Sequence, residues 1–169
     1  MVRVGPEKVR RALARVAMVD QHGEVLLDRW VRPEEPVTDY RTPWSGVRAG
    51  DLEGPLVLEL ADAQALVAGL LQGRLLVGHS VDHDLEVLRL EHPAGSTRDT
   101  AKYPPFMTGR GRSRKSQPLR KLAASELGLD IQEGEHSPVE DARAAMKLYL
   151  RHRAIWEQKV ASKELQGPC

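Results

Sequence analysis

The stretch Glu135-His136-Ser137-Pro138-Val139-Glu140-Asp141 carries the clearest structural signal in the chain. Ser137 is a favourable helix N-cap, and Pro138 suits the first helical position. Glu140 follows Ser137 at the spacing of a Ser-x-x-Glu capping box. The pattern predicts a helix that begins at Ser137 and continues to about Trp156.

The same helix start places an imidazole beside a carboxylate. His136 comes directly before the helix, and Asp141 lies in its first turn, where the partial positive charge of the helix end favours an anion. A simple helix start preceded by a solvated histidine explains this stretch equally well. Both interpretations stay open until other residues are considered.

Composition sets the broad class of protein. The chain has 169 residues, which suits one domain with its own core, and no internal repeat or second domain is evident. No apolar run approaches the ~20 residues needed to span a bilayer, and no signal peptide opens the chain, so no membrane partner is expected. The only cysteine is Cys169, which excludes an internal disulfide and favours the cytosol or nucleus. The net charge of +1 means that attraction to nucleic acid requires a local basic patch.

Hydrophobic patterning predicts alternating helices and short strands after an initial hairpin. The predicted hairpin strands are 12–19 and 24–31, the later strands are 75–78 and 96–100, and the predicted helices are 56–71, 84–90, 118–127 and 137–156. This order is typical of an α/β sheet covered by helices. We expect one domain over residues 1–157 and a disordered tail over 158–169.

Three residues that suit metal-assisted hydrolysis fall where predicted strands or helices begin or end: Asp84, His136 and Asp141. Carboxylates hold divalent ions, and two-metal phosphodiester hydrolysis places its ions ~3.5–4 Å apart. A histidine that titrates near neutrality is a suitable general base for the attacking water.

The spacing of these residues resembles that of a known enzyme family. His136 and Asp141 resemble the third motif of the DEDDh 3′→5′ exonucleases, and the segment around Asp84 resembles the second motif. Three further segments resemble the RNA exonuclease 4 branch, which also contains the interferon-stimulated exonuclease: Val37–Thr42, Ser45–Val47 and Arg98–Tyr103. The similarity extends from Met1 to about Trp156.

This resemblance implies a ribonuclease H-like mixed sheet flanked by helices. It also implies that Asp84 and Asp141 bind two Mg²⁺ or Mn²⁺ ions and that His136 deprotonates the attacking water. The expected substrate is single-stranded RNA, with DNA left open, and the nucleotide at the 3′ end leaves as a 5′-monophosphate. A monomer, a nuclear or nucleolar setting and a role in ribosomal RNA processing are further expectations.

One departure from the family pattern concerns its first motif, an Asp-x-Glu that precedes a Met-Val pair and a glycine-rich turn. Here Met1 and Val2 match that pair, the two acids are absent, and Glu7 lies on the other side of the turn. Two divalent ions carry a charge of +4, whereas Asp84 and Asp141 supply only −2. We therefore expect a shortened first central strand, weak metal binding and little exonuclease activity. The alternative is a catalytically disabled module that binds nucleic acid or protein.

Several other residues are weaker candidates. A basic loop could track an RNA backbone, although a solvated loop explains the same charges; its residues are Arg110, Arg112, Arg114 and Lys115. Tyr40 and Trp44 lie in a long loop and are candidates for stacking on bases. Asp99 is either an extra metal ligand or a structural residue, and the family pattern favours the structural role.

The residues His79, His83 and Asp84 also resemble the metal-binding pattern of helical phosphohydrolases. Those enzymes are entirely helical, whereas residues 75–78 form a short apolar run typical of a buried strand. The exonuclease interpretation is therefore preferred.

Overall fold

A computed structural model describes residues 1–6 and 10–165, with only the main chain described for Arg112 and residues 163–165. Glu7 and Cys169 thus lie outside the described residues. The strands are β1 (Val2–Val4), β2 (Arg10–Ala12), β3 (Arg15–Val19), β4 (Val25–Trp30), β5 (Val37–Asp39), β6 (Leu76–Gly78) and β7 (Thr97–Asp99). The α-helices are α1 (Thr42–Ser45), α2 (Leu60–Leu71), α3 (Asp82–Leu88), α4 (Leu119–Leu122) and α5 (Pro138–Leu165). A π-helical turn, Ala123–Leu127, continues α4, and short 3₁₀ turns occupy Ala49–Leu52, Ala94–Ser96, Pro104–Phe106 and Gly111–Ser113.

The predicted hairpin is confirmed as β3 and β4, which pair in antiparallel register with Val16 opposite Arg29. Asp20 fixes the turn, because its Oδ1 accepts hydrogen bonds from the backbone N–H groups of His22 and Glu24 at 2.8 and 2.9 Å. Leu13 and Ala14 separate β3 from β2, so the predicted single strand 12–19 is interrupted.

The strands form three small sheets instead of one continuous sheet. β1 lies between β2 and β5, β3 pairs with β4, and β6 pairs with β7 in parallel. Within the described residues, β3 and β6 therefore each have one strand partner. Val2–Val4 does not supply the second partner, because its own partners are β2 and β5. The α/β class is as expected, and the strands divide into three small sheets where the first central strand is short.

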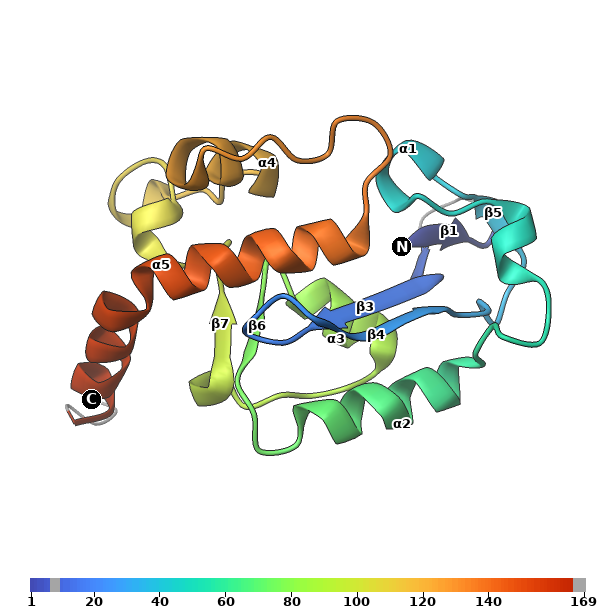
Figure 1. Cartoon of the computed structure of the whole chain (residues 1–169), viewed down its shortest axis with the longest axis horizontal. Coiled ribbons are helices and arrows are strands. Elements are labelled where there is room, and N and C mark those ends of the chain that lie inside the picture. The colour runs from blue at the N-terminus through green and yellow to red at the C-terminus, as the bar shows by residue number, and fades with distance from the viewer. Residues whose placement is uncertain (7–9, 166–169) are drawn as a thin grey trace.

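Helices cover both sides of these strands. In Figure 1, α5 crosses one side of β3 and β6 while α2 lies on the other side. The largest buried cluster joins α4 and α5 to an aromatic stack in which Tyr103 lies on Trp156 with ring centroids 3.8 Å apart. None of the helices in the described ranges is long and apolar enough to cross a membrane.

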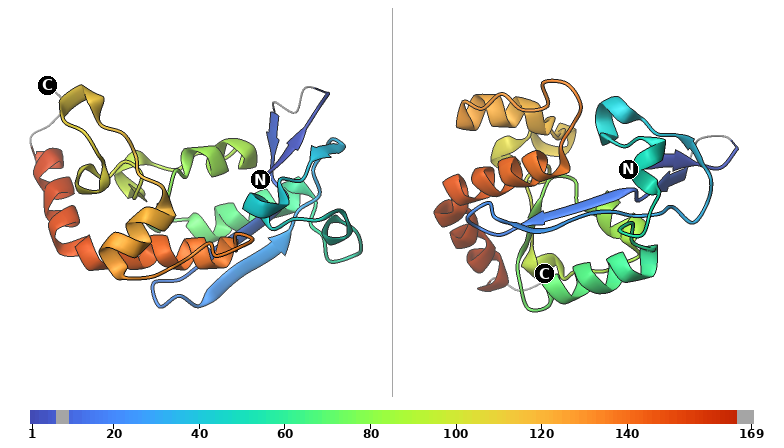
Figure 2. Two further views of the ribbon diagram at one scale, coloured as in Figure 1. Left: turned by 90° about the horizontal axis from the view of Figure 1, so that it is seen from above. Right: turned by 45° about the vertical axis from the view of Figure 1, so that its right-hand side comes forward.

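α5 is longer than expected. It continues nine residues past Trp156 to Leu165, and Val160 still packs against the buried cluster around Trp156. The predicted disordered tail is therefore wrong for residues 158–165, which are helical, and residues 166–169 lie outside the described residues. Figure 2 shows the end of α5 at the opposite side of the molecule from β1 and β2.

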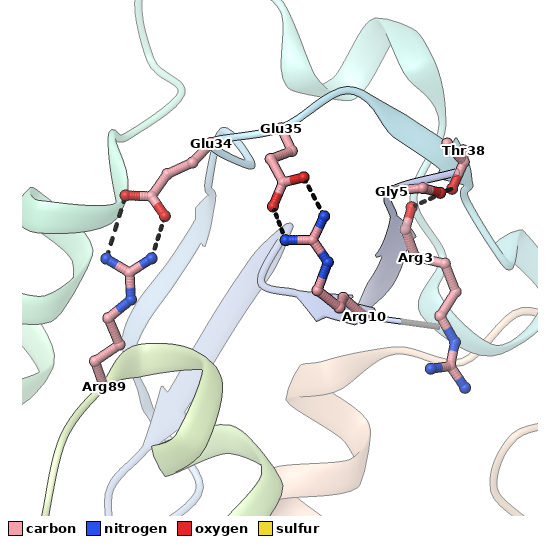
Figure 3. Close-up of polar contacts among 7 residues, drawn as sticks. All are labelled: Arg3, Gly5, Arg10, Glu34, Glu35, Thr38 and Arg89. Atoms are coloured by element: carbon pink, nitrogen blue, oxygen red, sulfur yellow. Dashed lines mark hydrogen bonds and ion pairs between the residues drawn. The ribbon is translucent and has the colours of Figure 1, made fainter. Parts of the chain in front are cut away.

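Hydrogen bonds and ion pairs fix the loop that follows β4 to neighbouring elements (Figure 3). Glu35 binds Arg10 of β2 through two contacts of 2.6 Å, and Glu34 binds Arg89 at the end of α3. The Thr38 hydroxyl donates to the backbone carbonyls of Arg3 and Gly5. These contacts fix the chain direction as it enters the segment that contains α1.

Candidate active site

The start of α5 is built partly as the sequence predicts. The Ser137 hydroxyl accepts a long hydrogen bond, 3.5 Å, from the backbone N–H of Glu140. A capping box would also have the Glu140 carboxylate accept from the backbone N–H of Ser137. This part of the prediction is wrong, because the carboxylate accepts from the backbone N–H of Gln132 at 3.0 Å. The Gln132 side chain in turn donates to Oδ1 of Asp141 at 2.8 Å. Gln132 thus orients the carboxylate, a role that no spacing pattern in the sequence indicates.

Asp84 lies in the first turn of α3, which begins at Asp82 and therefore two residues earlier than predicted. The chain reaches α3 from β6 through Ser80, whose backbone has a positive φ of 62°. Ser80 is fixed there because its backbone N–H donates to Oδ1 of Asp99 at 2.7 Å. The end of β6 and the start of α3 are thus positioned by a contact with β7.

Asp99 has a structural role, as the family pattern suggests. Its Oδ1 also accepts from the backbone N–H of Ala101 at 2.9 Å, and only 6% of the residue is exposed. Its Oδ2 is buried without a hydrogen-bond partner among the described residues. Asp99 does not line the cavity that contains the other acidic residues.

Asp84, His136 and Asp141 line one cavity of about 560 Å³, although they come from α3, the residue before the α5 cap, and α5. The cavity extends between β3 and β6, and its walls include apolar residues of α2 and α5. Its polar lining includes Trp44, His79, Asp84, Gln132, His136 and Asp141. The three residues singled out from the sequence therefore lie around the same space.

The surroundings of the cavity raise the pKa of both of its carboxyl groups. Burial raises the pKa of Asp141, while the hydrogen bond from Gln132 and the nearby His136 lower it in part. Surrounding protein also raises the pKa of Asp84, although its side chain still reaches solvent. Burial lowers the pKa of His79. A cation bound between the two carboxylates would favour their charged forms.

The described residues do not complete a metal centre. Over residues 1–6 and 10–165, no group of three His, Cys, Asp or Glu side chains is arranged to hold a metal ion. Asp84 and Asp141 offer two carboxylates, whereas a pair of divalent ions needs more negative donors. Asp84 and Asp141 therefore do not fit a two-ion centre by themselves.

The two aromatic candidates differ in their surroundings. Tyr40 is half-buried and packs against the small apolar cluster of Val2, Ala14, Val47 and Leu52. Trp44 is 61% exposed and lines the cavity. Arg41 lies over its indole ring at 5.1 Å from the ring centroid, a contact that no sequence pattern indicates.

The basic loop is separate from the cavity. Arg110, Arg114 and Lys115 are exposed, and none of them lines the cavity. Figures 1 and 2 show this loop at the end of the molecule away from the start of α5. The Arg112 side chain lies outside the described part of the chain. A role for this loop in RNA binding stays a prediction.

The sequence has curated relatives over nearly its whole length. It is 48% identical over 160 residues to RNA exonuclease 4 of Cryptococcus neoformans and 45% identical over 157 residues to RNA exonuclease 4 of Homo sapiens. These matches cover 95% and 93% of this chain but only 38% and 36% of those proteins. The chain thus spans less than half of the length of these two relatives. No family model matches the sequence.

Solved structures show the same fold. The Saccharomyces cerevisiae Pan2 pseudoubiquitin hydrolase–RNA exonuclease module in complex with AAGGAA RNA matches with a TM-score of 0.79, at 29% identity, over 98% of this chain and 30% of that one. The Neurospora crassa Pan2 catalytic unit matches with a TM-score of 0.74, at 26% identity, over 92% and 26%. The ribonuclease H-like architecture is therefore confirmed. By sequence, residues 1–169 are homologous to part of the RNA exonuclease 4 proteins, and by fold they are similar to the RNA exonuclease module of Pan2.

Proposed function

We propose that this chain carries part of the active site of a 3′→5′ exonuclease that acts on single-stranded RNA. The observation that carries the proposal is the convergence of Asp84, His136 and Asp141 on one cavity. The RNA exonuclease 4 relatives and the RNA-bound Pan2 modules support RNA as the substrate. The assay below, repeated with a 5′-labelled single-stranded DNA, tests whether DNA is also accepted.

In the proposed reaction, His136 accepts a proton from the water that attacks the terminal phosphodiester. The water oxygen bonds to phosphorus, and the bond from phosphorus to the 3′ oxygen of the preceding nucleotide breaks. That oxygen takes up a proton from solvent and becomes the new 3′-hydroxyl, and the terminal nucleotide leaves as a 5′-monophosphate. Gln132 keeps the Asp141 carboxylate in place through its 2.8 Å hydrogen bond. Dependence on Mg²⁺ or Mn²⁺ belongs to the proposal through the family resemblance, with Asp84 and Asp141 as the ligands that this chain offers.

A second function is favoured by the incomplete metal centre over the described ranges. In that case the chain binds RNA or a protein and does not hydrolyse RNA. The nuclear or nucleolar setting and the role in ribosomal RNA processing rest only on the resemblance to RNA exonuclease 4. A fluorescent fusion and the ribosomal RNA precursors of a deletion strain would test them.

Shortening of a 5′-labelled single-stranded RNA in Mn²⁺ distinguishes the two functions. We expect the unchanged chain to remove nucleotides slowly and one at a time from the 3′ end. Asp84→Asn and His136→Ala should abolish this activity. Asp82→Asn is the matched control, since Asp82 lies two residues from Asp84 but binds Lys102 and does not line the cavity. Binding of RNA without shortening would favour the binding module. Equal shortening by Asp84→Asn and the unchanged chain would rule out the proposed site.

A further inference from the structure

Trp44 is the one large aromatic side chain of the described residues that is both exposed and part of the cavity lining. An apolar side chain that is 61% exposed has no role in the core. Arg41 lies over the indole and restricts its orientation, and more than half of the side chain remains open to solvent. A flat, exposed ring at the edge of a cavity has the shape and chemistry on which nucleobases stack.

The segment that carries Trp44 is held by internal hydrogen bonds. Ser45 is buried, and its hydroxyl donates to the Tyr40 carbonyl at 2.6 Å while accepting from the backbone N–H of Val47 at 3.1 Å. The Thr42 hydroxyl donates to the Val47 carbonyl at 2.7 Å. These contacts hold α1 in one conformation, so the indole is presented without an ordering cost for its backbone.

Three contacts join this segment to the residues around His136. The backbone N–H of His136 donates to the Pro43 carbonyl at 3.3 Å. Gly46 approaches so closely that a Cβ at this position would lie 2.7 Å from the His136 carbonyl oxygen. Arg48 forms an ion pair with Glu135. The position of Trp44 is therefore set relative to the proposed general base.

We propose that Trp44, with Arg41 over its ring, is a binding subsite for the nucleobase at the 3′ end of the RNA. Stacking there places the terminal phosphodiester beside His136, because both residues line the same cavity and their backbones are joined. The inference rests on the proposed function for the identity of the ligand. It adds that the terminal nucleotide is held through its base as well as its phosphate.

The test measures RNA affinity with EDTA present, so that hydrolysis plays no part. The probes are a heptaadenylate RNA and the same RNA with an abasic 3′-terminal nucleotide, in low salt. The unchanged chain should bind the complete RNA about 5-fold to 100-fold more tightly than the abasic one. Trp44→Ala should remove this difference, and Trp44→Phe should keep most of it because phenylalanine retains an aromatic face.

Ile155→Ala is the matched control, since Ile155 is 56% exposed and does not line the cavity. It should bind both RNAs as the unchanged chain does. Equal affinity of the unchanged chain for the two RNAs, or a difference that survives Trp44→Ala, would overturn the subsite. Failure of the proposed function is a separate result, seen when RNA shortening persists in Asp84→Asn.

Discussion

Gly46 follows α1 and lies against the backbone carbonyl of His136. Its φ of +63° lies in the left-handed region, where a side chain is strained. The approach of the His136 carbonyl also leaves no room for a Cβ. One glycine therefore allows the turn after α1 and the close contact with the start of α5.

Gly46→Ala should lower the free energy of unfolding by more than the ~1–2 kcal/mol of left-handed strain, because it adds a clash. Gly73→Ala is the control, since Gly73 has a φ of +67° and a Cβ added there would meet no atom within 4 Å. Urea unfolding measures the loss in both variants, and the excess loss in Gly46→Ala reports the clash with the His136 carbonyl. Equal losses in the two variants would show that the contact has no energetic weight.

At the scale of single residues, the sequence predicts the three site residues but not their orientation. The places of Asp84, His136 and Asp141 at element ends make them candidates, and the resemblance to the exonuclease motifs singles them out. The role of Gln132 depends on a contact between the loop before α5 and α5, which local patterns do not encode. The contact of Arg41 with Trp44 is local, but it depends on the backbone conformation of the segment that carries both residues. The partial burial of Tyr40 follows from the same kind of long-range packing.

Among the elements, α5 shows what local signals do and do not specify. Ser137 and Pro138 are strong start signals, and they predict where the helix begins. The predicted end, at the last large aromatic residue, is too early. The segment 157–165 consists largely of good helix formers and has no stop signal, so propensity alone argues for continuation.

The continuation of α5 is joined to β7 by an ion pair. The Glu157 carboxylate accepts from two nitrogens of the buried Arg98, at 2.8 and 2.7 Å, and from the Tyr149 hydroxyl at 3.0 Å. The Arg98 guanidinium lowers the pKa of Glu157. The pair therefore stabilises the fold above the ordinary pKa of a glutamate and loses this effect as pH falls through the lowered value.

Glu157→Gln should lower the free energy of unfolding by about 1–2 kcal/mol at neutral pH. The loss is no larger because part of the carboxylate is exposed and solvent screens the ion pair. The cost should shrink toward zero in acid, because the carboxylate of the unchanged chain is then protonated as well. Urea unfolding across pH measures it. Glu35→Gln, in an exposed pair with Arg10, is the control and should cost less at neutral pH. A cost independent of pH would contradict the assignment.

Across the whole molecule, the feature with the largest consequence for stability is the cavity between β3 and β6. Each strand has one partner within the described ranges, and both line the cavity of about 560 Å³. Unpaired backbone groups cost ~1–3 kcal/mol each when buried, against a total stability of ~5–15 kcal/mol. The sequence predicts the order of elements but not this division into sheets, because strand pairing depends on contacts far apart in the chain.

We expect marginal stability with local opening along these strands. By hydrogen exchange, backbone N–H groups of β3 and β6 that face the cavity should exchange much faster than those of the buried residues Ala144, Ala145 and Leu148 in α5. A thermal melt should show a low or broad transition. Uniformly slow exchange with a sharp mesophilic transition would contradict this expectation.

The central claim is that the chain holds a general base and two carboxylates of an exonuclease site that needs further negative donors. The most direct measurement compares Mg²⁺-dependent RNA shortening by residues 1–169 with that of a version extended before Met1 by a strand ending in Asp-x-Glu. The extended version should release 5′-monophosphates faster, because the added carboxylates supply further metal ligands. His136→Ala in that version should lower the rate by ~10²–10⁴-fold, the usual contribution of a general base, and so remove the gain. Equal rates for the two lengths, or a gain that survives His136→Ala, would contradict the account.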